Sequence, residues 1–178
     1  MLAVQRIKYG GGVAHHLTRH CVRLGVAMKI KQERYIEAYG RIDSSIKSEH
    51  FFEAITIEES IISDRLASFL ESTDTLKSDQ IHRQNFSSLI MLWKLATNTQ
   101  GSIWESCDTL IQRTDNWRKE RNKYVHGLVK FPSQKANIPN TKDFIAGAKQ
   151  TALDGKELAK EISNWRKRQV ALKRKYNK

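Results

Sequence analysis

The sequence predicts an all-α fold, a single-domain helical bundle of about five helices. Apolar residues recur at intervals of three and four through most of the chain, which is the spacing of one buried helical face. Only two prolines and nine glycines interrupt the 178 residues, too few for a β-sandwich or a disordered chain. A chain of this length forms one domain around a single core.

The first 30 residues form a basic N-terminal extension that differs from the bundle expected over residues 31–178. The extension contains the run Tyr9–Gly12, and only one acid, Glu33, precedes Arg34. We expect it to be partly flexible or to pack as an accessory hairpin or helix. Two alternatives are that the protein starts at Met28, or that the segment is a mitochondrial presequence. The absence of serine and the three consecutive glycines argue against a presequence.

Five segments carry the helical spacing, and polar residues mark where several of them begin. The clearest segment, Glu49–Glu71, has two phenylalanines near its start and a broad apolar stripe after them. Asp79, Ser102 (with Glu105 in a capping box) and Thr141 are the expected N-caps of the last three helices. The expected helices are Glu33–Lys47, Glu49–Glu71, Phe86–Ala96, a helix from Ile103 to His126, and a final helix from Thr141 past Trp165.

An arginine interrupts the apolar row of the fourth helix. The row steps alternately by four and three and consists of Ile103, Cys107, Leu110, Thr114, Trp117, Arg121, Tyr124 and Leu128. Because an unpaired buried charge is very costly, Arg121 must meet a carboxylate, face a cleft or lie at a subunit boundary. The acids of the second helix, Glu58, Glu59 and Asp64, are either its partners or solvated surface charges.

Two further polar residues follow Arg121 at the end of this helix. Asn122 and His126 are four residues apart and therefore share a neighbouring face. Gly127 is expected to end the helix in the left-handed conformation. His126 then lies in the last turn, where the helix dipole favours a charged imidazole. An arginine fork that can hold a phosphate, next to a histidine that can move a proton, indicates phosphodiester chemistry.

The segment Arg121-Asn122-Lys123-Tyr124-Val125-His126 resembles the Arg-polar-x-x-x-His motif of HEPN domains, a family of small helical bundles. The resemblance covers Lys31 to Lys178, and only Arg121, Asn122 and His126 carry function across. Many members of the family are metal-independent endoribonucleases in toxin–antitoxin, abortive-infection and CRISPR-associated systems. The resemblance therefore implies RNA cleavage in a toxin or anti-phage defence role, with a cognate antitoxin or sensor protein as a further partner.

RNA cleavage without a metal can use the 2′-hydroxyl of RNA as the nucleophile. We expect His126 to transfer a proton, Arg121 to hold the scissile phosphate and Asn122 to orient one of these groups. Cleavage usually needs both an acid and a base, and the motif supplies one histidine per chain. The resemblance accordingly implies a homodimer with two motifs across one cleft. Arg121 and His126 are five residues apart, about 140° around an ideal helix, so a distorted last turn or the long arginine side chain must bring them together.

The charge of the chain points to a polyanionic partner, first a nucleic acid and second an anionic membrane, and the resemblance makes RNA the expected one. The net charge is +12, and the tail from Trp165 to Lys178 is strongly basic with interspersed aromatics. Such a tail suits a phosphate backbone, although a solvated helix end has the same composition. The expected substrate-binding residues are Lys123 and Lys130 beside the motif, and Arg166, Lys167 and Arg168 in the tail.

Several classes of protein are excluded or disfavoured by what the chain lacks. It has no uninterrupted apolar stretch long enough to cross a membrane, and no Walker loop, GxGxxG or HExxH motif. We expect no cofactor and no metal site, since His15, His16, His20 and Cys21 cluster only in the glycine-containing basic segment. The two cysteines have no metal-binding or redox spacing, which favours a reducing, cytoplasmic location.

Two rival interpretations remain open. One is a catalytically inactive HEPN-like bundle that binds RNA or a partner protein, and the other is an unrelated basic helical adaptor. In both, His126 would be a helix-capping residue and Arg121 a structural ion pair. The direction of the Arg121 and His126 side chains, into a cleft or into packing, separates an active site from these alternatives.

Overall fold

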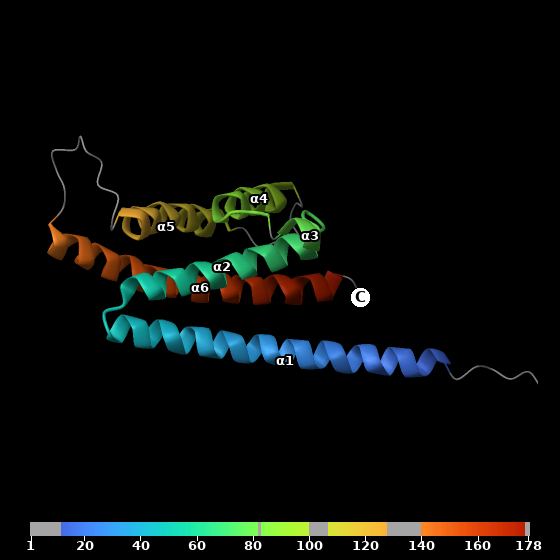
Figure 1. Ribbon diagram of the computed structural model, residues 1–178. Helices are drawn as coiled ribbons and strands as arrows, with labels where there is room; N and C mark the ends of the chain where they lie inside the picture. Colours follow the sequence, from blue (N-terminus) through green and yellow to red (C-terminus); the bar gives the residue numbers. More distant parts are fainter. Residues whose placement is uncertain (1–11, 82, 100–106, 128–139, 177–178) are drawn as a thin grey trace, which may run out of the picture. The chain divides into compact units, whose positions relative to one another are not determined.

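The computed structural model describes residues 12–81, 83–99, 107–127 and 140–176, and within these ranges it contains helices and short connections but no strand. The all-α prediction is therefore confirmed. Six helices lie in the described part, of which one is a single turn (Figure 1). They are α1 (Gly12–Lys47), α2 (Phe51–Ser72), α3 (Ser78–Ile81), α4 (Phe86–Thr99), α5 (Asp108–Gly127) and α6 (Thr141–Tyr176).

The chain divides into two compact units, Met1–Glu37 and Ala38–Lys178, and α1 contributes to both. In the first unit α1 is already helical at Gly12, well before the expected start at Glu33. In the second unit the last turns of α1 contact α6 through a hydrogen bond and an ion pair. The hydroxyls of Tyr39 and Ser163 share a hydrogen bond of 3.2 Å, and Lys156 forms an ion pair of 2.6 Å with Asp43.

Helix α2 is the central element of the second unit. It packs against α6, α4, α3 and α5, and α5 packs in turn against α4 and α6 (Figure 1). The buried side chains of α2 repeat at the predicted intervals of three and four, as Ile55, Ile62, Leu66 and Phe69 do. The ring of Trp165 on α6, which is 1% exposed, lies 4.8 Å from Phe69 and 5.1 Å from Trp93 between ring centroids. These three rings bury a large apolar area where α2, α4 and α6 meet.

Helices α1 and α2 both end in a left-handed residue that is not glycine. Glu49 (φ 62°) and Asp74 (φ 55°) occupy these positions. After Glu49, the amide of His50 donates to the carbonyl of Ser45 at 2.8 Å, and the amide of Glu49 donates to Ile46 at 3.2 Å. This pair of bonds is the Schellman motif, which normally places glycine at the left-handed position because other residues are strained there.

The N-caps of two helices differ from the expected residues by a few positions. Asn85, not Asp79, caps α4, since its side-chain oxygen accepts from the amide of Ser88 at 2.9 Å. Asn140, not Thr141, caps α6 by accepting from the amide of Asp143 at 2.9 Å. An asparagine oxygen reaches the third amide of a helix as well as a serine or aspartate oxygen does. The proposed capping box at Ser102 and Glu105 lies outside the described residues.

Candidate functional site

The apolar row predicted for the motif helix is confirmed for its described members. Cys107 and, along α5, Leu110, Thr114, Trp117 and Tyr124 are all buried. Arg121 follows in this row, and its side chain is 18% exposed. Ile103 and Leu128 lie outside the described residues. The structure therefore places the arginine where the sequence predicts it, partly buried between helices, and a partner for its charge is required.

The partner of Arg121 is Glu59 on α2. One terminal nitrogen of the guanidinium, Nη2, donates to the Glu59 carboxylate, whose side chain is also 18% exposed. The other terminal nitrogen, Nη1, donates to Oδ1 of Asn122 at 2.6 Å. The Nε atom is buried and has no hydrogen-bond partner among the residues that the structure describes. Burial lowers the pKa of Arg121 from its ordinary value, but a guanidinium stays charged in proteins.

His126 lies one turn further along α5 and is exposed. It makes no hydrogen bond with the described part of the chain. The structure thus brings Arg121, Asn122 and Glu59 together by hydrogen bonds, whereas His126 is a neighbour in sequence that faces solvent.

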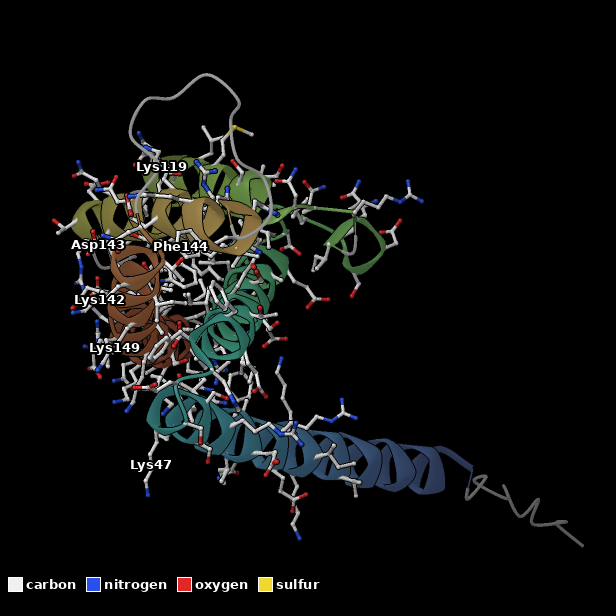
Figure 2. The ribbon with its side chains drawn as sticks, turned by 60° about the vertical axis from the view of Figure 1, so that its left-hand side comes forward. Lys47, Lys119, Lys142, Asp143, Phe144 and Lys149 are labelled. Carbon is white, nitrogen blue, oxygen red and sulfur yellow. The ribbon has the colours of Figure 1, made fainter. Side chains whose placement is uncertain are left out.

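Aromatic packing on α6 holds the last turns of α5 in place. The Phe144 ring lies 5.3 Å from the Tyr124 ring in an edge-to-face arrangement, and Figure 2 shows Phe144 where the start of α6 meets α5. Gly147 leaves room for the Tyr124 hydroxyl, because a Cβ there would stand 2.1 Å from that oxygen. Gly127 is the last helical residue of α5 and does not adopt a positive φ, so the left-handed stop expected there is wrong. It packs instead toward Phe144, which a Cβ would meet at 3.3 Å.

The expected substrate-binding residues occupy different environments. Lys123, Lys167 and Arg168 are exposed, and Lys123 forms an ion pair of 3.6 Å with Glu120. Arg166 is buried, and its guanidinium donates to the carbonyl of Ser68 on α2 at 3.0 Å. Burial and, next, the charge of Arg65 lower the pKa of Arg166. Lys130 lies outside the described residues.

Glu58, the neighbour of Glu59, is a buried carboxyl whose environment the sequence did not reveal. Its side chain is fully buried, and neither oxygen has a hydrogen-bond partner in the described structure. It lies against Gly155 of α6, where a Cβ would stand 2.1 Å from Oε2 and 2.7 Å from the Trp117 ring. Burial raises the pKa of Glu58 to about 9, although Lys156 opposes the shift. The carboxyl is therefore neutral near pH 7. The only signal in the sequence was its position in the apolar row of α2.

Other features of the second unit do not converge on Arg121. A groove between α4 and α5 has Ile90, Met91 and Ile111 in its wall and Lys94 and Lys119 among its polar residues. Within the described side chains, no group of three or more His, Cys, Asp or Glu residues could hold a metal ion. None of the described helices has the length and apolar character needed to cross a membrane.

No protein-family model, curated protein or solved structure matches this chain. The assignment of a function therefore depends on the geometry around Arg121 and on the motif that contains it.

Proposed function

We propose that the protein is a metal-independent endoribonuclease of the HEPN type, with Arg121, Asn122 and His126 at its active site. The proposal is supported above all by the guanidinium of Arg121, which Glu59 and Asn122 hold from two sides in the last two turns of α5. A phosphate site needs such a fixed fork, because an arginine that is already oriented loses less conformational freedom on binding. A role in a toxin–antitoxin or anti-phage system, with an antitoxin or sensor as partner, is part of the same proposal.

The Arg121 guanidinium retains donors for a substrate. It carries five N–H groups, and the bonds to Glu59 and Asn122 use two of them. A further N–H on each terminal nitrogen is available to the oxygens of a scissile phosphate, where negative charge develops during cleavage. Glu59 and Asn122 each hold one terminal nitrogen of the guanidinium and so fix its orientation. Both therefore act as positioning residues toward Arg121.

In the proposed reaction the 2′-oxygen of a ribose attacks the adjacent phosphorus and the bond to the 5′-oxygen breaks. A base takes the proton of the 2′-hydroxyl, and an acid returns a proton to the leaving 5′-oxygen. The products are a 2′,3′-cyclic phosphate and a 5′-hydroxyl, and no water or metal is consumed. His126 supplies one of the two proton transfers. A homodimer that faces two α5 ends across one cleft supplies the second His126, and this dimer belongs to the proposal.

The test is cleavage of total RNA and transfer RNA in EDTA by the wild type, Arg121→Ala and His126→Ala. His50→Ala is the matched control, because His50 is also exposed but lies at the start of α2. We expect cyclic phosphate ends from the wild type and the control only, with circular dichroism showing that all four proteins are folded. Equal cleavage by all four would refute the proposed site.

An alternative is a catalytically inactive bundle that binds RNA or a partner protein. It is favoured by the same ion pair, because Glu59 partly neutralises the charge that a phosphate would meet. Glu59→Gln separates the two functions. If Arg121 serves only folding, this variant lowers stability and leaves RNA affinity unchanged. If Arg121 serves cleavage, the variant lowers kcat more than it changes KM, since a loosened fork loses transition-state contacts.

A further inference from the structure

One face of α6 carries a row of cations along its whole length. Lys142, Lys149, Lys160, Lys167 and Arg174 are 7, 11, 7 and 7 residues apart in sequence, and at about 100° per residue they fall within a band of about 40°. From Lys142 to Arg174 the helix rises by about 48 Å. Figure 2 shows Lys142 and Lys149 on the same side of α6, directed away from the other helices of the bundle. We call these five exposed residues the α6 ridge.

Most of the ridge is not neutralised by the protein itself. Lys160 forms an ion pair of 3.0 Å with Glu157. The other four members, Lys142, Lys149, Lys167 and Arg174, form no ion pair with the described residues. Two other acids of α6 have partners outside the ridge: Glu161 pairs with Arg113 of α5 at 2.6 Å, and Asp143 accepts from the Asn140 cap. The ridge is therefore a line of four free positive charges on an otherwise unbroken helix.

The aromatic side chains of α6 do not lie on the ridge. Phe144 packs against Tyr124, and Trp165 is in the core. Tyr176, which is 62% exposed, stands beyond the last ridge residue. Proteins that bind single-stranded nucleic acid stack its bases on aromatic rings along the groove, and the ridge offers none. A base-paired helix, by contrast, presents mainly phosphates and sugars to a protein.

We propose that the α6 ridge binds the sugar–phosphate backbone of base-paired RNA, without reading its sequence. The inference rests on the proposed function for the choice of RNA, and it adds the substrate class. The ridge begins at Lys142, in the turn of α6 whose Phe144 packs on the last turns of α5. This end of the ridge is therefore the one near the last turns of α5, and in the proposal cleavage falls at a loop or end next to the paired region.

The test measures binding to a 2′-O-methyl RNA duplex of about 20 base pairs and to one of its strands alone. These RNAs lack the 2′-hydroxyl nucleophile, so no cleavage can occur and the result does not depend on the nuclease chemistry. The ridge variant is Lys142→Gln/Lys149→Gln/Lys167→Gln. The control variant, Lys77→Gln/Arg83→Gln/Lys94→Gln, removes three exposed cations from α4 and the segment before it.

For the wild type we expect the duplex to bind more tightly than the single strand. Four phosphate contacts give a slope of about −3.6 for the logarithm of affinity against that of salt concentration, since each contact contributes about 0.9. The ridge variant should lose at least about tenfold in affinity at low salt, and its slope should flatten by about 2.7 units. The control variant should bind nearly as the wild type does.

Three outcomes would overturn the inference: equal weakening by both variants, tighter binding of the single strand, or no duplex binding at low salt. Each is separable from a failure of the nuclease proposal. If the wild type cleaves RNA but the ridge variant binds duplex normally, only the ridge inference is wrong. If the ridge variant loses duplex binding but no protein cleaves RNA, the ridge inference holds and the nuclease proposal fails.

Discussion

Glu58→Gln should remove a large part of the pH dependence of folding. The Glu58 carboxyl is fully buried without a hydrogen-bond partner in the described structure, and burial raises its pKa from 4.5 to about 9. In the unfolded chain the same carboxyl ionises near its ordinary pKa. As the pH rises from 4.5 toward 9, only the unfolded chain releases this proton readily, so stability is greatest below 4.5 and is lost across that range.

The size of the effect follows from the two pKa values. One pKa unit corresponds to about 1.4 kcal/mol. Between about pH 5 and pH 8 the Glu58 carboxyl is ionised in the unfolded chain and protonated in the folded protein, so its contribution to the free energy of unfolding falls over nearly three pH units. The wild type should therefore lose about 4 kcal/mol of unfolding free energy from this group alone over that interval. A glutamine at this position does not titrate, so the stability of the variant relative to the wild type should increase by the same amount.

The measurement is urea unfolding, followed by circular dichroism, at several pH values for the wild type, Glu58→Gln and a control variant. Glu53→Gln is the matched control, because Glu53 is an exposed carboxylate on the same helix. The other titrating groups are common to all three proteins and cancel in the differences. Parallel stability–pH curves for the wild type and Glu58→Gln would refute the reasoning, since they would mean that Glu58 ionises in the folded protein as it does in water.

Four further substitutions test the packing and the helix ends. Gly155→Ala should destabilise the protein by about 3 kcal/mol, because the new Cβ would overlap the Glu58 carboxyl; an unchanged urea midpoint would contradict the close approach. Asn140→Ala should cost about 1 kcal/mol through loss of the α6 cap. Thr141→Ala should have little effect. A lower thermal midpoint for Thr141→Ala than for Asn140→Ala would show that the threonine is the cap. Glu49→Gly should stabilise the protein by roughly 1 kcal/mol, because glycine adopts the left-handed conformation without strain; a lower melting temperature would rule this out.

The periodicity of the sequence was sufficient to predict the helices but not their ends. The apolar rows of α2 and α5 are local patterns, and a helix can be recognised from them because each turn repeats the same geometry. Helix ends depend on single hydrogen bonds, as at Asn85 and Asn140, where a neighbouring residue is chemically almost equivalent. The start of α1 at Gly12 was missed because its basic sequence contains a run of glycines.

The sequence left three environments open for Arg121, a carboxylate partner, a cleft or a subunit boundary, and it could not choose between Glu58, Glu59 and Asp64 as the partner. Glu58 and Glu59 are adjacent, and about 100° of helix rotation separates their side chains. The rotation of α2 against α5 and α6 directs Glu59 to Arg121 and Glu58 into the contact with Gly155. This rotation results from the summed packing of the whole core, including Trp165, and no local pattern of residues encodes it.

The sequence by itself determined an all-α chain with a net charge of +12 and an arginine in the apolar row of one helix, since composition and periodicity suffice for each. Only the tertiary structure decided that Glu59 is the partner, that Glu58 is buried as a neutral acid, and that Arg166 faces the core while Lys167 faces solvent. The physical reason is that a side chain's environment depends on neighbours from distant helices. In α2 and α6, one step along the helix separates the buried interior from water.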